Sequence, residues 1–204
     1  MLYTPPHFNA SAAQAARLIR ANPLATLIGP GEEPIVTHAP LLLDDASEPW
    51  RLMGHVARAN PHWQAWEQTP EVLVVFQGGD AYISPSLYSA RKAVPTWNYA
   101  VVHVWGRIAV THDSERKEQV LKALIGQHDP AYHTQWDALE PDFREGMKSG
   151  IVAFSIEMQR VDAKFKLSQN RPADDRARVL QAMEQGDEKA RALAQWMKAS
   201  PDTP

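Results

Sequence analysis

The chain has 204 residues, a formal net charge of −3, an apolar fraction of 44% and no cysteine. This length suits one domain with a substantial core, and the lack of cysteine excludes disulfides, thiolate metal sites, iron–sulfur clusters and cysteine nucleophiles. The net charge gives no general attraction to nucleic acid or to an anionic membrane. Because the N-terminal stretch MLYTPPHFNA lacks a signal-peptide pattern and no apolar run is long enough to span a bilayer, we expect a soluble, cytoplasmic protein.

The first half of the chain has the pattern of one helix followed by short strands. Ser11 with Gln14 three residues later is a helix-capping pattern, and the Asn-Pro pair at 22–23 ends that helix. The glycine-containing stretches 29–33 and 77–80 are typical of hairpin turns. In chain order we predict a helix at 11–23, strands at 24–28, 34–43 and 50–57, a short helix at 60–68, and strands at 71–76 and 81–84.

The stretch VPTWNYAVVHVWGR, which starts at Val94, opens a longer strand that extends to about residue 110. Side chains alternate between the two faces of a strand, and here the two faces differ. Val102, Val104, Ile108 and Val110 fall on an apolar face, and Val101, His103, Trp105 and Arg107 fall on an amphipathic face. The apolar face belongs in a core, whereas the amphipathic face suits a subunit interface or a ligand site.

The second half of the chain contains both helical and extended patterns. A helix is predicted at 113–126, with Asp113 as its cap and Gly126 as its stop. A loop-rich aromatic passage then leads to a long strand at 150–167, and the tail forms two helices that break at 186–187. About seven strands at hairpin spacing, without the regular strand–helix alternation of a parallel sheet, predict an antiparallel barrel decorated with helices.

The common catalytic and nucleotide-binding motifs are absent from the sequence. It contains no Gly-x-Gly-x-x-Gly, no Walker loop and no Gly-x-Ser-x-Gly. Eight histidines are present, but none pairs with a recognisable third ligand at a spacing that suits a metal ion. We therefore predict no metal site.

Two polar segments follow predicted strands and are candidates for binding an anion. Arg58 and Asn60 lie where a strand passes into a helix, so Arg58 and the helix N-terminal amides could together hold a phosphate. The alternative is an ordinary turn with a surface arginine. The segment KFKLSQNR (164–171) has three basic and three polar residues, and it fits either a groove for an anionic or heterocyclic ligand or a solvated loop.

Aromatic and hydrogen-bonding residues gather in two further segments, AYISPSLY and VPTWNY. Together these segments contribute Tyr82, Ser84, Tyr88, Trp97, Asn98 and Tyr99. A hydrogen-bonding strand end with stacking aromatics is what a flat, polar ring such as an isoalloxazine requires, although such clusters also occur in ordinary cores.

Five blocks of the sequence resemble a known family. YTPPHF, GHVARANPHW, AYISPSLY, VPTWNYAVVHVWG and KFKLSQNR span residues 3–171 in the order of the recurring blocks of the PaiB-like FMN-binding proteins, often described as negative transcriptional regulators. The resemblance implies an FMN-binding split barrel of the pyridoxamine-phosphate-oxidase-like type. Together with the element pattern it predicts a mainly β (α+β) fold, an antiparallel split β-barrel with peripheral helices and a C-terminal helical hairpin. It also implies a homodimer that binds FMN between its subunits.

The resemblance further implies where the cofactor binds. In that superfamily a basic or polar segment after a central strand holds the FMN phosphate, and by position it falls at 58–60; relatives with oxidase activity tend to carry Ser-Arg-Lys there, whereas this chain has ARANP. The side chains at 97–98 would border the ring together with His55. Lys166 or Arg171 would face the N1–C2=O edge, where positive charge favours the anionic reduced flavin. The full set of expected cofactor-binding residues is His55, Arg58, Asn60, Tyr82, Ser84, Trp97, Asn98, Lys166, Ser168, Gln169, Asn170 and Arg171.

We expect residues 1–172 to form the FMN-binding domain and residues 173–204 to form a helical appendage packed on it. If the protein is an enzyme, it is an FMN-dependent oxidoreductase. His103 is a candidate general acid, but a histidine on a barrel strand is more often structural, so we assign no catalytic residue.

Two alternative functions remain open at this point. A DNA-binding repressor would use the tail, whose second helix carries Lys189, Arg191 and Lys198. Leu193 and Trp196 on the same helix equally fit packing on the barrel, and the net negative charge does not favour DNA. A haem-binding split barrel would need an axial ligand, for which the eight histidines supply candidates without singling one out.

Overall fold

The computed structural model describes residues 1–30 and 33–200 and divides into two compact units. Unit 1 consists of Met1–Asn22, Phe76–His103 and the residues from Asp162 onward. Unit 2 consists of Pro23–Val75 and Val104–Val161. Each unit is described by itself below.

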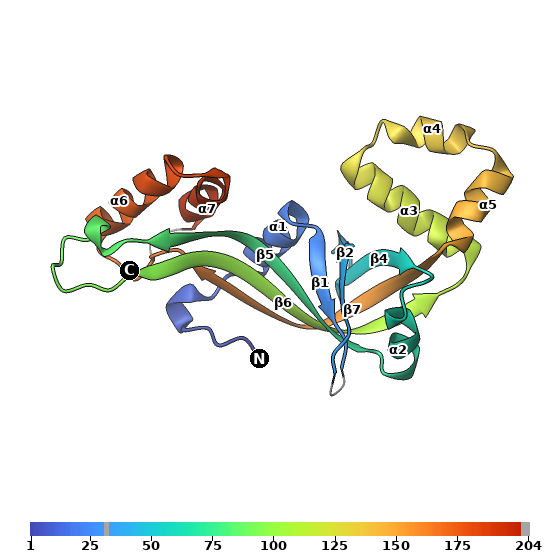
Figure 1. The fold of residues 1–204 in the computed structure, drawn as a ribbon, viewed down its shortest axis with the longest axis horizontal. Coiled ribbons are helices and arrows are strands. Elements are labelled where there is room, and N and C mark those ends of the chain that lie inside the picture. Colours follow the sequence, from blue (N-terminus) through green and yellow to red (C-terminus); the bar gives the residue numbers. More distant parts are fainter. Residues whose placement is uncertain (31–32, 201–204) are drawn as a thin grey trace. The chain divides into compact units, whose positions relative to one another are not determined.

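Within the described residues, seven strands form one sheet in the order β2-β1-β5-β6-β7-β4-β3 (Figure 1). The pairs β1–β2, β1–β5, β3–β4 and β4–β7 are antiparallel. The strands are β1 (Leu24–Ile28), β2 (Val36–Pro40), β3 (Leu42–Asp44), β4 (Arg51–Ala57), β5 (Glu71–Ile83), β6 (Thr96–Thr111) and β7 (Ile151–Lys166). The predicted fold class, an antiparallel split barrel with peripheral helices, is confirmed.

The helices include those predicted at the two ends of the chain. In the capping box of α1, the Gln14 amide nitrogen donates to Ser11 Oγ at 3.2 Å and the Ser11 amide nitrogen donates to Gln14 Oε1 at 2.9 Å. The helices are α1 (Ala12–Ala21), α2 (His62–Gln68), α3 (Ser114–His128), α4 (Tyr132–Ala138), α5 (Pro141–Ser149), α6 (Ala173–Glu184) and α7 (Glu188–Ala199), with 3-10 turns η1 (Pro6–Phe8) and η2 (Pro85–Leu87). No helix in the described ranges combines the length and the apolar composition that a membrane span requires.

The hairpin predicted at 77–80 is wrong, because β5 runs through it as one continuous strand. Its glycines serve close packing in unit 1 instead of a turn. A Cβ atom at Gly79 would lie 2.7 Å from the Lys189 carbonyl oxygen and 3.3 Å from the Leu193 amide nitrogen, both in the backbone of α7. The strand therefore needs glycine where the helix crosses it.

The strand predicted at 34–43 is divided into β2 and β3. β2 pairs with β1, and β3 pairs with β4, so the chain changes its partner strand between them. Pro40 ends β2 and has no N–H to continue a ladder. The next residue, Leu41, is buried and donates its own N–H to the Pro23 carbonyl oxygen at 2.9 Å. The predicted β1–β2 hairpin is confirmed by the strand pairing, while residues 31–32 of its loop lie outside the described residues.

The passage predicted to be loop-rich, before the long strand β7, contains two helices instead. α3 continues through Gly126 to His128, and α4 and α5 follow it. A Cβ at Gly126 would lie 3.2 Å from His133 Nε2, so this glycine allows a close approach to α4 and does not end α3. The buried Trp136 of α4 donates from Nε1 to Glu118 Oε1 of α3 at 2.7 Å. These tertiary contacts stabilise short helices that have little periodic signal of their own.

Each unit has its own apolar core. The largest fully buried side chains of unit 1 are Leu18, Ile19, Phe76, Ile83, Phe165 and Leu167. Those of unit 2 are Leu27, Leu41, Leu52, Trp66, Phe154 and Ile156. Along β6 the predicted alternation holds, since Val102, Val104 and Ile108 are buried whereas His103 and Trp105 are only partly buried.

Candidate functional site

A small pocket in unit 1, of about 210 Å³, collects five of the predicted cofactor-binding residues. They come from the start of β6 and from the end of β7 with the turn that follows it. The five are Asn98, Lys166, Ser168, Asn170 and Arg171. The pocket is completed by Phe8, Tyr88, Val94, Pro95 and Thr96.

Two of the lining residues, Asn98 and Ser168, form a buried hydrogen-bonded pair. Asn98 on β6 donates from Nδ2 to Ser168 Oγ at 2.9 Å, and both side chains are buried. Ser168 has a φ of 63°, in the left-handed region that residues other than glycine seldom adopt. Because such a conformation is costly and persists only where several contacts enforce it, the turn after β7 has a firmly defined shape.

Gln169 is part of this turn, but its side chain forms hydrogen bonds with backbone groups of the chain. Its Oε1 accepts from the Leu167 amide nitrogen at 2.7 Å, and its Nε2 donates to the Phe165 carbonyl oxygen at 2.5 Å. The buried side chain therefore shapes the end of β7 and does not line the pocket.

The pocket carries two cationic side chains, and none of the described residues that line it is acidic. Lys166 donates from Nζ to the Trp97 carbonyl oxygen at 2.9 Å and also to Thr96 Oγ1. Burial lowers the pKa of Lys166, and the nearby positive charges of Lys164 and Arg171 lower it further. The Arg171 Cζ lies 4.1 Å from the centroid of the Tyr88 ring. The pocket therefore has a positive potential that attracts anions.

Two exposed aromatic side chains lie on β5 and β6 of unit 1. The rings of Tyr82 and Trp97 meet edge to face, with centroids 6.0 Å apart and planes at 75°. They are 52% and 53% exposed, and together they form an exposed aromatic pair on the surface of unit 1. The predicted Ser84 has a local role, since its Oγ accepts from the Ser86 amide nitrogen at 3.2 Å and caps η2.

The three remaining predicted residues lie in unit 2. Arg58 donates from Nε to the Ser149 carbonyl oxygen at 2.7 Å and from Nη2 to the Ile151 carbonyl oxygen at 3.4 Å. A guanidinium in this position neutralises the partial negative charge at the end of α5. That Arg58 holds a phosphate stays a prediction; the structure shows its contacts with the backbone at the α5–β7 junction.

Asn60 and His55 also have local environments in unit 2. Asn60 accepts from the His62 amide nitrogen at 2.9 Å and donates from Nδ2 to Thr37 Oγ1 at 3.1 Å, so its amide organises the start of α2. His55 Nδ1 is buried without a hydrogen-bond partner in the described part of the chain, and burial lowers the pKa of this imidazole. Their predicted cofactor roles are likewise untested by these contacts.

Some lining residues were not predicted as binding residues. Thr96 and Tyr88 belong to sequence segments that were singled out for their polar and aromatic content, and Phe8 belongs to the block YTPPHF. Phe8 lines the pocket because the N-terminal segment lies along β7, where the Ala10 amide nitrogen donates to the Ala163 carbonyl oxygen at 3.2 Å. No local pattern signals such a long-range contact.

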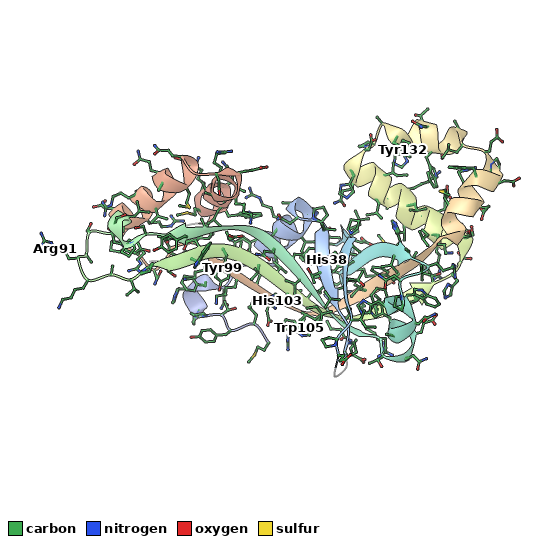
Figure 2. The ribbon with its side chains drawn as sticks, in the orientation of Figure 1. His38, Arg91, Tyr99, His103, Trp105 and Tyr132 are labelled. Carbon is green, nitrogen blue, oxygen red and sulfur yellow. The ribbon has the colours of Figure 1, made fainter. Side chains whose placement is uncertain are left out.

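The face of β6 opposite the core carries Tyr99, His103 and Trp105 (Figure 2). Burial lowers the pKa of His103, although the Asp162 carboxylate raises it in part. The lowered pKa disfavours the protonated imidazole.

The C-terminal helix pair packs within unit 1. The Trp196 ring of α7 meets the Phe165 ring edge to face, with centroids 5.4 Å apart. The Arg17 Cζ of α1 lies 4.8 Å from the centroid of the Trp196 ring. The apolar stripe of α7 is thus used for packing.

The basic side chains of α7 all contact acceptors of the chain itself. Lys189 Nζ lies 3.7 Å from Asp80 Oδ2, and Lys198 Nζ lies 2.5 Å from Glu184 Oε1. Arg191 donates from Nη1 to a carbonyl oxygen just before the helix at 2.6 Å.

Comparison with known sequences identifies close relatives. A family model described as "Putative FMN-binding domain" matches residues 2–160. The Bacillus subtilis protein "Protease synthase and sporulation protein PAI 2" is 33% identical over 202 residues, which cover 97% of each chain. "Uncharacterized protein AN0679" of Emericella nidulans is 28% identical over 221 residues, covering 87% of this chain and 88% of that protein.

Solved structures share the fold at low sequence identity. The flavocytochrome Anf3 from Azotobacter vinelandii aligns with a TM-score of 0.60 and 18% identity over 76% of this chain and 67% of that chain. The FAD and heme binding protein from Mycobacterium smegmatis aligns with a TM-score of 0.61 and 16% identity over 82% and 77%, respectively. These likenesses establish the fold alone. The family model and the PAI 2 relative establish the family: the chain belongs to the PaiB-like FMN-binding split-barrel proteins, and FMN is its cofactor.

Proposed function

We propose that the protein works as a flavoprotein whose FMN contacts unit 1. The observation that carries this proposal is the exposed aromatic pair Tyr82–Trp97 beside a positively charged pocket. Lys166, which lines the pocket, donates a hydrogen bond to the Trp97 carbonyl oxygen and so connects the two. FMN combines a flat ring, hydrogen-bonding edges and an anionic phosphate. Aromatic faces suit the ring, and amide, hydroxyl and cationic groups suit the polar and anionic parts, so the donor set of unit 1 fits this cofactor.

Different residues of unit 1 would contact different parts of the cofactor. Tyr82 and Trp97 would cover the flat ring, while Asn98 and Ser168 hold the turn in shape. When bound, FMN supplies the capacity for hydride transfer, and the protein supplies orientation and charge. If Lys166 or Arg171 faces the N1–C2=O edge of the ring, as the resemblance implies, its positive charge would favour the anionic reduced form. We propose an FMN-dependent oxidoreductase as the enzyme class, should the bound flavin turn over a substrate.

We also propose that two copies of the chain form a homodimer and share the cofactor. The support is the exposure of Tyr82 and Trp97, together with that of Val94, which is 72% exposed and lines the same pocket. Burial of such a surface against a second copy and a flat ring removes apolar area from water. A regulatory role would then act through the bound small molecule or through a protein partner, because the apolar stripe of α7 packs within unit 1 and the net charge of −3 does not attract DNA.

Titration of the purified full-length protein with FMN tests the proposed function. We expect flavin bands in the visible spectrum and saturable quenching of FMN fluorescence. Trp97→Ala should weaken FMN binding by about tenfold, as expected for the loss of a stacked aromatic. Phe143→Ala is the matched control, because Phe143 is 52% exposed but lies on α5 in unit 2.

The outcomes of this titration separate the alternatives. A protein that neither carries nor binds flavin contradicts the proposal. A Soret band on addition of haem would instead support the haem alternative. A mobility shift of DNA that persists as the salt concentration is raised would support direct DNA binding, since nonspecific electrostatic binding is lost under those conditions.

A further inference from the structure

The volume of the unit 1 pocket limits what it can hold. Pockets that enclose whole drug-sized ligands start at about 300 Å³, whereas this pocket measures about 210 Å³. Within one chain it therefore encloses one functional group better than a tricyclic ring. We propose that the pocket is an oxyanion-binding subsite, which takes the phosphate of FMN or the phosphate or carboxylate of a separate ligand. The first of these sources rests on the proposed function, and the second does not.

The charge of the pocket selects an anion. Lys166 and Arg171 are the charged side chains among the described lining residues, and both are cationic. Burial and the neighbouring cations disfavour the charged form of Lys166 and lower its pKa. A bound oxyanion would compensate this charge and accept charge-assisted hydrogen bonds, so it would supply the negative charge that none of the described lining residues provides.

Contacts within the chain hold both cations in place before any ligand arrives. Lys166 Nζ is tied to the Trp97 carbonyl oxygen, and the Arg171 guanidinium stacks on the Tyr88 ring. Side chains that are already ordered lose less conformational entropy when they bind a ligand. The two cations are therefore preorganised for binding, unlike mobile lysine and arginine side chains on an open surface.

The segment that carries Tyr88 is itself fixed by α6. Asp175 Oδ1 accepts from the Ser89 amide nitrogen at 2.9 Å, and Arg178 donates from Nε to the Leu87 carbonyl oxygen at 2.9 Å. Asp175 also pairs with Arg178 and does not line the pocket, although its charge also acts on Arg171. Helix α6 thus contributes to the shape of the anion subsite.

Calorimetric titration of the full-length protein with inorganic phosphate, at neutral pH and constant ionic strength, tests the subsite. We expect saturable binding that Lys166→Met weakens by about tenfold or more, because a hydrogen bond to a charged group is lost. Lys166→Arg should retain most of the binding. Lys189→Met is the matched control, since this lysine lies in unit 1 but outside the pocket. Arg171→Gln provides a second test if Lys166→Met shows a lost thermal transition.

Comparison of FMN with riboflavin, which lacks the phosphate, identifies the source of the oxyanion. If the pocket takes the FMN phosphate, phosphate competes with FMN, and Lys166→Met weakens FMN but not riboflavin. If it takes a separate ligand, the same variant loses phosphate binding while FMN affinity stays within about twofold. Phosphate binding that depends on Lys166 in a protein that binds no flavin supports the subsite and contradicts the proposed function. Absence of phosphate binding, or equal binding by wild type, Lys166→Met and Arg171→Gln, overturns the subsite.

Discussion

Among single residues, Ser168 combines the most constrained backbone with a buried hydrogen bond. Its φ of 63° costs about 1–3 kcal/mol in a residue with a side chain. Its hydroxyl pairs with the buried Asn98 amide. Ser168→Ala keeps the backbone strain and leaves that amide without its partner, so we expect the free energy of unfolding in urea to fall by about 1–3 kcal/mol.

The glycine variant separates the two effects at this position. Ser168→Gly loses the same hydroxyl but relieves the strain, because glycine adopts positive φ without steric cost. It should therefore destabilise less than Ser168→Ala in the same urea titration. Equal losses in the two variants would show that the backbone conformation contributes nothing measurable.

His62 gives the protein a pH-dependent stability. Its ring is buried in unit 2, with Nδ1 2.9 Å from Thr37 Oγ1, and burial lowers its pKa from 6.5. Between the lowered folded pKa and 6.5, the unfolded chain binds more protons than the folded chain. Stability therefore rises with pH in this window, is complete above it, and is lost as pH falls through it. His55 and His103, whose pKa values are also lowered by burial, act in the same direction.

Unfolding in urea at a series of pH values measures this dependence. We expect the wild-type free energy of unfolding to fall as pH is lowered below about 6.5, and we expect His62→Gln to have a shallower slope because one of the contributing groups is gone. An unchanged slope in His62→Gln would argue against this residue as a source.

At the level of elements, the crossing of β5 and α7 explains why Gly79 lies inside a long strand. A Cβ on Gly79 would lie 2.7 Å from the Lys189 carbonyl oxygen, and backbone cannot yield as a flexible side chain can. We expect Gly79→Ala to lower the thermal midpoint, with a cost of about 1–3 kcal/mol for overpacking. Gly146→Ala is the control: nothing lies within 4 Å of a Cβ there, and in α5 alanine should stabilise by about 0.5–1 kcal/mol. Equal effects would contradict the close crossing.

The same crossing shows where the sequence pattern was insufficient. Gly78–Gly79 between two apolar runs has the composition of a hairpin turn, and only contacts with distant segments reveal its purpose: Leu18 and Ala100 lie against Gly78, and the α7 backbone lies against Gly79. The number of strands agreed with the expectation because two errors cancelled, since β5 joined two predicted strands and Pro40 divided another into β2 and β3. Elements with strong local signals, such as the capped α1 and the alternating β6, were predicted correctly.

The candidate site was predictable in its residue types and less so in its contacts. The segment 164–171 and Asn98 do meet in unit 1, as their polar and basic composition suggested. Gln169 and Ser84 belong to the predicted set, yet their side chains bond to nearby backbone. Which of several adjacent polar side chains reaches a pocket depends on turn geometry, here the positive φ of Ser168, and no residue pattern specified it.

For the whole molecule, the proposed homodimer makes cofactor binding and self-association one linked equilibrium. If FMN contacts both copies, it binds the dimer more tightly than the single chain, and it must then strengthen association. Sedimentation velocity over a dilution series should show FMN shifting the equilibrium towards the dimer. FMN affinity, measured by fluorescence quenching, should weaken once the protein is diluted below its own dimer dissociation constant.

The reciprocal nature of the linkage makes this prediction strict. A symmetric dimer has two equivalent sites, so FMN must strengthen association of the FMN-bound chains by the product of the two affinity ratios, dimer over single chain, because all these steps close one thermodynamic cycle. Trp97→Ala, on the exposed aromatic surface, should reduce both quantities together, whereas Phe143→Ala should change neither. A dimer that binds FMN no better than the single chain would place the whole cofactor site within one copy, and the exposed Tyr82–Trp97 surface would then require a different partner.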